Sequence, residues 1–238
     1  MTTAPKQFVI GLDLGKLRDF SAVCVLERQT AQVAPRTPGW QFDDDGNPIR
    51  PGQVLKSARY NVGYLQRFKL NTPYPEIIAR VRSLRGRLPG APQLVIDATG
   101  CGLPVLDFFA QVGLNPIGVL ITGGDRESHE RRLYRVPKQT LVSLVDRAMQ
   151  AKELKIHNGL PDAAVLRREL ENFEVGFSGT GHMTFNERVG QHDDLILSLA
   201  IALWWAANRR GPIIISDEAL RWASSRGGPG TMTPPAVW

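Results

Sequence analysis

Four aspartates stand where hydrophobic segments begin or end. Asp13 closes the apolar run of FVIGLDLG, Asp97 closes that of LVIDATG, and Asp193 and Asp194 open GQHDDLILSLAIALWW. A fold that brings these segments together gathers carboxylate oxygens, the ligands that Mg²⁺ and Mn²⁺ prefer. Taken singly, each aspartate has a structural explanation, because an acidic pair at a helix start is also stabilised by the helix dipole. Taken together, they predict a divalent-metal site.

The elements that must position these aspartates follow from apolar patterning and chain breakers. In chain order, the first half predicts strands at 8–12, 22–26 and 60–70, a helix at 75–88, a strand at 93–96, a helix at 103–112 and a strand at 116–121. The first two strands form an antiparallel hairpin, and the last three elements form a β-α-β unit, which implies parallel strands. Ligands gather at the carboxyl ends of such strands, so Asp13 and Asp97 are expected to converge.

The second half of the chain is more helical. It predicts helices at 138–154, 161–173 and 193–208, with a short strand at 182–185. The last of these helices is apolar nearly all round, which is typical of a helix packed on several sides. The pattern as a whole predicts an α/β fold with a central mixed sheet, an antiparallel hairpin at its start and flanking helices.

Domain organisation follows from breaks in this pattern. Residues 1–208 are expected to form one domain, with an exposed excursion at about 29–58 that includes a small hairpin around Gly46 and Asn47. Residues 209–238 lose the hydrophobic period and form a Gly/Pro-rich tail, which we expect to be loosely attached.

Composition limits the classes of function. The 238 residues are 42% hydrophobic and carry a net charge of +6, so an anionic partner such as nucleic acid is expected. Cys24 and Cys101 fit no zinc spacing and are too few for a disulfide framework, which indicates a reducing cytosol. No signal segment opens the sequence, and the longest apolar run, 195–207, is shorter than the ~20 residues of a spanning helix. A cytoplasmic protein without a membrane partner is therefore expected.

Five further side chains are candidates for nucleic-acid contacts. Lys138, at the start of its helix, is either a phosphate contact or a solvated lysine. The basic stretch with Arg131, Arg132 and Arg135 is either a mobile DNA-facing loop or a polar connection. His192 either positions a water or phosphate, or is a helix-capping or surface histidine. Phosphate contacts of this kind give salt-sensitive binding that tolerates many DNA sequences.

The chain resembles RNase H-like nucleases of the retroviral-integrase superfamily, and specifically the nuclease domain of phage large terminase subunits. GLDLG with a following hairpin, VIDATGCG with a following helix, and VGQHDDLILSLAIALWWA occur in that order. The resemblance covers roughly residues 8–208. It implies an RNase H-like fold and an endonuclease that cleaves double-stranded DNA during phage genome packaging, in the cytosol of a bacterial host.

The resemblance also implies a mechanism, two-metal phosphodiester hydrolysis with two Mg²⁺ or Mn²⁺ ions held by Asp13, Asp97 and one or both of Asp193 and Asp194. We assign the bridging role to Asp13, one ion to Asp97 and the other to Asp194. Asp193 would be an auxiliary ligand, because adjacent helix residues point about 100° apart and only an irregular start lets both bind. The implied partners are a motor ATPase, a small terminase subunit and the portal.

Two departures keep other functions open. Large terminases usually carry an ATPase motor, and this chain has no G-x-x-x-x-G-K-S/T loop. GLDLGKLRDFSAV also resembles the first phosphate loop of actin-like kinases and ATPases, although a helix rather than a glycine-loop hairpin is expected after Asp97. Junction resolvases share the fold and its four acids. A catalytically silent DNA-binding or assembly module would keep the basic surface without a metal site.

Overall fold

The computed structural model describes residues 6–15, 19–33, 41–42, 48–49, 55–100, 103–172, 175–177, 183–185 and 193–208. The predictions for His192, Cys101 and the tail 209–238, and for much of the excursion, fall outside these residues. The domain boundaries therefore stay a prediction. None of the described helices combines the length and the apolar character that crossing a bilayer requires.

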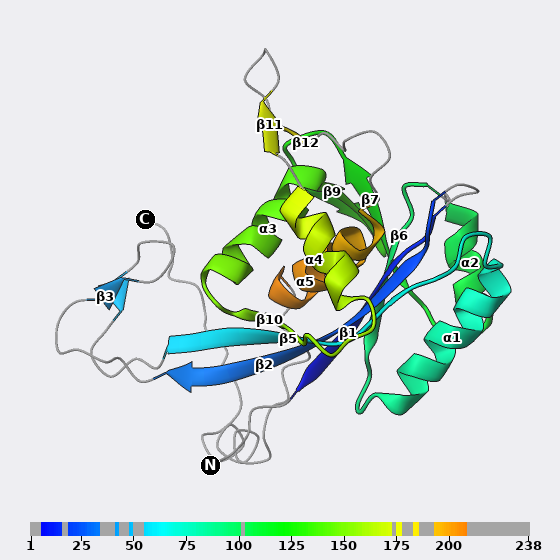
Figure 1. The fold of residues 1–238 in the computed structure, drawn as a ribbon, viewed down its shortest axis with the longest axis horizontal. Helices are drawn as coiled ribbons and strands as arrows, with labels where there is room; N and C mark the ends of the chain where they lie inside the picture. The colour runs from blue at the N-terminus through cyan, green and yellow to red at the C-terminus, as the bar shows by residue number, and fades with distance from the viewer. Residues whose placement is uncertain are drawn as a thin grey trace, which may run out of the picture.

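A mixed sheet of eight strands forms the centre of the described residues (Figure 1). Its order is β10-β5-β2-β1-β6-β7-β9-β8. The strands are β1 (Gln7–Asp13), β2 (Ala22–Val33), β5 (Leu55–Arg67), β6 (Gln93–Asp97), β7 (Ile117–Thr122), β8 (Ser128–Glu130), β9 (Leu133–Pro137) and β10 (Leu154–Ile156). The hairpin β1–β2 is antiparallel, and β1, β6, β7 and β9 are mutually parallel neighbours. The predicted hairpin and β-α-β unit are confirmed.

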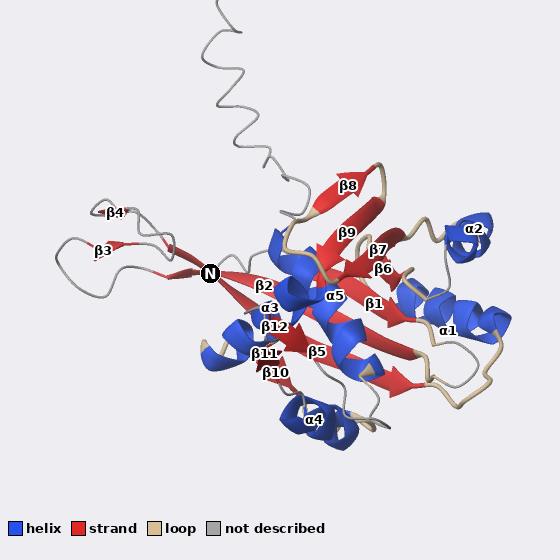
Figure 2. Cartoon of the chain, turned by 90° about the horizontal axis from the view of Figure 1, so that it is seen from above, coloured by secondary structure: helices blue, strands red, loops and turns tan. Residues whose placement is uncertain are grey.

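Helices cover both faces of this sheet (Figure 2). On one face lie α1 (Tyr74–Arg87) and α2 (Leu103–Gln111), and on the other lie α3 (Lys138–Gln150), α4 (Ala163–Asn172) and α5 (Asp194–Asn208). Alternation along the strands divides the core accordingly. Ile10 and Leu12 of β1 pack with α1 and α2, whereas Val9 packs with α5. The predicted α/β class, with its mixed sheet and flanking helices, is confirmed.

Two short hairpins stand outside this sheet. β3 (Gln41–Phe42) pairs antiparallel with β4 (Pro48–Ile49), in agreement with the hairpin expected around Gly46 and Asn47. β11 (Val175–Phe177) pairs antiparallel with β12 (Met183–Phe185), the short strand expected near the end of the domain.

Two features of the middle of the chain differ from the expected elements. The basic stretch, expected as a mobile DNA-facing loop or a polar connection, contains strands, because β8 and β9 form a hairpin and β9 extends the sheet by pairing with β7. The helix expected over 138–154 ends at Gln150. Lys152 has a positive φ of 57°, which ends the helix, and Leu154 then pairs with Tyr60 of β5.

Candidate metal centre

The register of β1 and β6 places the first two aspartates side by side. Leu12 pairs with Ile96 in the parallel ladder, so Asp13 and Asp97 leave their strands at the same edge. Since side chains alternate along a strand, Asp13 lies on the side of Gly11 and Asp97 on the side of Val95. Both of these positions face α5. The predicted convergence of Asp13 and Asp97 is therefore present.

α5 supplies the third carboxylate because it crosses β1 unusually closely. A Cβ atom at Gly11 would lie 2.0 Å from the carbonyl oxygen of Ser198 and 2.9 Å from the Cβ of Ala202. Only glycine in the strand, opposite small residues in the helix, allows this approach. The contact brings the first turn of α5, with Asp194, to the edge where Asp13 and Asp97 end.

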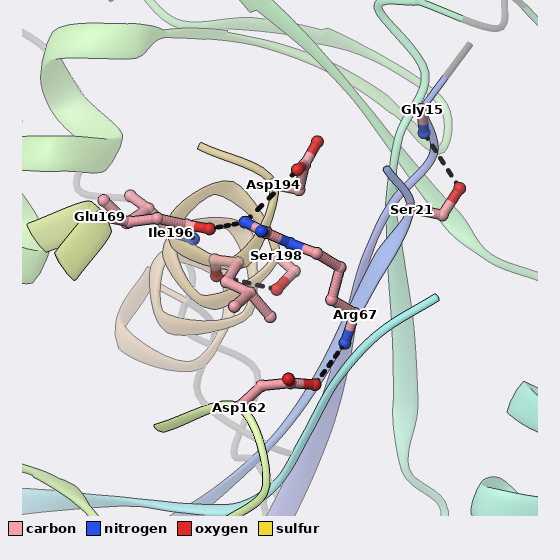
Figure 3. A network of polar contacts seen from close by, with 9 residues as sticks. Gly15, Ser21, Arg67, Asp162, Glu169, Asp194, Ile196 and Ser198 are labelled. Atoms are coloured by element: carbon pink, nitrogen blue, oxygen red, sulfur yellow. Dashed lines mark hydrogen bonds and ion pairs between the residues drawn. The ribbon is translucent and has the colours of Figure 1, made fainter. Parts of the chain in front are cut away.

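The turn after Asp13 is equally tight. A Cβ atom at Gly15 would lie 2.3 Å from the backbone oxygens of both Asp19 and Phe20. The backbone N–H of Gly15 donates a hydrogen bond of 3.1 Å to the hydroxyl of Ser21 (Figure 3). The glycine of the GLDLG motif therefore serves the geometry of the turn that follows the aspartate.

The aspartates are buried and act on each other electrically. The exposed fractions of Asp13, Asp97 and Asp194 are 8%, 7% and 5%. Burial raises the pKa of Asp13 well above its ordinary value, and the negative charges of Asp97, Asp194 and Asp193 raise it further. The folded state therefore disfavours the ionised form of Asp13.

Asp97 is held in place by its own turn. Its Oδ1 accepts a hydrogen bond of 2.8 Å from the backbone N–H of Thr99, and the Thr99 hydroxyl accepts one of 2.7 Å from the N–H of Ile121 in β7. Burial raises the pKa of Asp97, whereas the hydrogen bonds from Thr99 and the charge of Lys138 oppose the rise. These contacts fix the orientation of the Asp97 carboxylate at the end of β6.

Two cations distinguish Asp193 from Asp194. The ammonium of Lys138 lies 2.9 Å from Oδ2 of Asp193, and the guanidinium of Arg67 lies 3.6 Å from Oδ2 of Asp194. Lys138 follows β9, whose carboxyl end shares the edge of Asp13 and Asp97. Lys138 is thus neither simply solvated nor positioned only for phosphate, because an aspartate of the cluster holds it. Of the pair, Asp194 is the more buried.

Sequence reasoning missed Arg67 and Glu169, which stand behind Asp194 (Figure 3). The guanidinium of Arg67, at the end of β5, donates to Oε1 of Glu169 on α4. The other oxygen, Oε2, accepts a hydrogen bond of 3.0 Å from the backbone N–H of Ile196 in the first turn of α5. A signal was present, because Glu169 is three residues after the buried Leu166 and therefore lies on the apolar face of the helix.

The residues present fit a hard divalent cation. The donors are all carboxylate oxygens, they come from three separate elements, and burial and the charges of Asp97 and Asp194 raise the pKa of Asp13. Among the described residues, no group of three or more acidic, histidine or cysteine side chains is arranged so that it could hold a metal ion, so the fit is one of donor type. Arg67 and Lys138 partly neutralise the negative charge of the cluster.

The other predicted contacts with nucleic acid are dispersed. Arg131 and Arg132 precede β9, which runs parallel to β7, so they lie at the edge opposite to Asp97. The guanidinium of Arg132 donates to the backbone oxygens of Pro116 and Asn115. Arg135 is exposed within β9, and His192 lies outside the described residues. Of the five candidates, the described structure brings only Lys138 to the aspartates.

Solved structures resemble this fold, whereas no protein-family model and no curated protein matches the sequence. The large terminase nuclease of thermophilic phage G20c with bound magnesium has a TM-score of 0.54 at 19% identity, over 85% of this chain and 84% of that chain. The same nuclease with bound cobalt has a TM-score of 0.53 at 17% identity, over 85% and 84%. The large terminase nuclease domain of Thermus phage P74-26 has a TM-score of 0.51 at 20% identity, over 88% and 86%.

The chain has the fold of a large terminase nuclease domain. The RNase H-like fold that the motifs predicted is thereby confirmed, over most of the chain and of the structures that it resembles. At these identities the similarity concerns the fold. What the chain does must be argued from its own residues.

Proposed function

We propose that this chain is a metal-dependent endonuclease that cleaves double-stranded DNA, as the nuclease component of a phage packaging machine. The observation that carries the proposal is the meeting of Asp13, Asp97 and Asp194 at one edge of the sheet. A fold shared with terminase nucleases, one with bound magnesium in its crystal structure, supports the same conclusion.

Each carboxylate has a role that follows from its position. Asp13 lies on β1 between the strand that ends in Asp97 and the helix that begins with Asp194, so it is the group suited to bridge two ions. Asp97 would hold one ion and Asp194 the other, with Asp193 as an auxiliary ligand. Two Mg²⁺ or Mn²⁺ ions bound there would activate a water and stabilise the leaving 3′ oxygen.

The proposed substrate is consistent with the charge of the chain. A net charge of +6 favours a polyanion. Lys138 stands beside the aspartates and is the residue best placed to approach a phosphate next to the scissile bond, while Arg131, Arg132 and Arg135 would meet only DNA that continues past the β8–β9 edge. A motor ATPase, a small terminase subunit and the portal remain the proposed partners.

A plasmid assay tests this function. The wild-type chain should nick or linearise supercoiled DNA with Mn²⁺ or Mg²⁺, with little sequence preference, and EDTA should stop it. Asp13→Asn should abolish cleavage, whereas Asp107→Asn, on the exposed surface of α2, should cleave as the wild type does.

Three outcomes would point elsewhere. Cleavage that survives EDTA or Asp13→Asn would exclude the metal mechanism. Turnover of ATP without DNA cleavage would favour the actin-like alternative. A strong preference for four-way junctions over linear duplex would favour a resolvase.

A further inference from the structure

Glu169 is a buried acidic residue that contacts two different elements of the fold. It is only 8% exposed, and its two oxygens contact two different elements, Arg67 of β5 and the Ile196 N–H of α5. That N–H is one of the donors that a helix leaves without a partner in its first turn. Glu169 therefore caps α5 from another helix, in the same first turn as Asp194, and binds the guanidinium of Arg67 at the same time.

Arg67 lies between two carboxylates and is shared unequally. Its guanidinium hydrogen-bonds to Glu169, while its distance of 3.6 Å from Asp194 exceeds that of a hydrogen bond. The guanidinium carbon lies 4.9 Å from the centroid of the Phe20 ring, in a cation–π contact that helps to hold the guanidinium in place. Within the described part of the chain, Nε of Arg67 has no hydrogen-bond partner. The Nε–H group of Arg67 could therefore donate a hydrogen bond to a second carboxylate.

We propose that Glu169 holds the guanidinium of Arg67 by a hydrogen bond and so limits its interaction with Asp194 to the longer ion pair of 3.6 Å, which a divalent ion can displace more easily. Glu169 and Arg67 are then positioning residues that set the metal affinity of the site. The inference rests on the proposed function, because it assumes that Asp194 is a metal ligand.

Charge determines the effect of changing either partner. Without the negative charge of Glu169, the nearest anionic partner of Arg67 is Asp194, and a charge-assisted bond is about twice as strong as a neutral one. A divalent ion would then have to displace the guanidinium from its ligand. Without Arg67, by contrast, the site has one positive charge fewer, and its attraction for a cation increases.

The two single variants should therefore shift metal affinity in opposite directions. Glu169→Gln, which keeps the shape and the acceptor for Ile196, should weaken Mn²⁺ binding by about tenfold, as is common for residues that orient metal ligands. Arg67→Gln should tighten Mn²⁺ binding, although it should lower the stability of the metal-free protein. In the double variant, loss of the released guanidinium should restore the affinity at least to that of the wild type.

A control separates charge from architecture. Oδ2 of Asp162 accepts a hydrogen bond of 2.7 Å from the backbone N–H of Arg67, so it joins the loop before α4 to β5 without contacting the guanidinium (Figure 3). Asp162→Ala should lower the melting temperature but leave Mn²⁺ affinity unchanged. A network that only held the helices together would affect Asp162→Ala and Glu169→Gln alike.

The experiment is a Mn²⁺ titration followed by electron paramagnetic resonance of free Mn²⁺, on the full chain and on each variant that circular dichroism shows to be folded. Plasmid cleavage against Mn²⁺ concentration is the second readout, and for Glu169→Gln it should need more Mn²⁺ but reach the wild-type rate at saturation. Should Arg67→Gln not fold, the double variant, a neutral pair of similar shape, carries the test.

The outcomes are distinguishable. Weaker binding in Glu169→Gln with recovery in the double variant supports the inference. If the wild type cleaves DNA but Glu169→Gln binds Mn²⁺ with the wild-type affinity, the inference is wrong. It is also wrong if the weaker binding persists in the double variant. A wild type that neither binds Mn²⁺ nor cleaves DNA overturns the proposed function itself.

Discussion

The two faces of the sheet are covered by helices of different character. The face under α1 and α2 is filled by apolar side chains such as Ile77, Val81 and Phe109. The face under α5 has a larger apolar core, and the buried Glu169, Asp194 and Ser198 lie within it or at its border. One face of the sheet is therefore stabilised mainly by apolar packing, whereas the other also contains buried polar side chains that require defined partners.

The difference has a physical reason. Apolar packing gains free energy in proportion to buried area and tolerates changes of shape that conserve volume. Buried charges are stable only with partners at defined distances, since an unpaired one costs several kcal/mol. The positions of the side chains on the α5 face must therefore be defined more precisely. Gly11, which allows α5 to approach β1 closely, and Glu169, which caps α5, help to define them.

Adding one methyl group to a glycine on each side gives the largest expected contrast. Gly11→Ala places a Cβ against the backbone of α5 and should destabilise the protein by about 3 kcal/mol or more, because the contact is with main chain that cannot move aside. Gly86→Ala, in α1, meets open space and should stabilise by about 0.4–1 kcal/mol. Urea unfolding of both variants measures the contrast, and equal effects would contradict the close crossing of α5 over β1.

A smaller effect is expected where the charge of one aspartate is removed. In EDTA at neutral pH, Asp13→Asn should raise the melting temperature by about 2–4 °C, which for a domain of this size corresponds to about 1 kcal/mol. The reason is that burial and the neighbouring carboxylates raise the pKa of Asp13 in the folded state. Asp107→Asn, exposed on α2, is the matched control and should change little.

The size of this effect depends on pH. An acid whose pKa is raised on folding binds its proton more tightly when folded, so the wild type loses stability as pH rises from the unfolded pKa of about 3.9 through the folded value. The advantage of Asp13→Asn should therefore disappear near pH 4 and be complete only above the folded pKa. Melting curves in EDTA across this range check it, and an advantage that persists at pH 4 would exclude the electrostatic explanation.

Local sequence predicted most of the fold because its elements carry strong local signals. Apolar periodicity and the aspartates at segment ends placed β1, β6 and α5 within a few residues of their observed bounds. The β8–β9 hairpin was missed since it is short and polar, and the pairing of β9 with β7 is tertiary. The helix α3 was predicted too long because the turn at Lys152 is a matter of backbone conformation.

The residues of the candidate site also differ in how far local sequence predicted them. Asp13, Asp97 and Asp194 were predicted from their places at the ends of elements, and the register of β1 with β6 brings the first two together. Arg67 and Glu169 are 102 residues apart, so no local pattern joins them. Lys138 was assigned a phosphate or solvent because its partner, Asp193, is 55 residues away. Sequence thus predicted the aspartates that meet at the edge of the sheet, while the residues that contact Asp193 and Asp194 required the fold.

Crystals soaked in Mn²⁺ test the central claim most directly, because the anomalous signal of the metal locates it without reference to activity. We expect anomalous peaks beside Asp13, with Asp97 on one side and Asp194 on the other, and none there in Asp13→Asn crystals treated alike. Peaks confined to other carboxylates, with none at Asp13 at millimolar Mn²⁺, would contradict the claim.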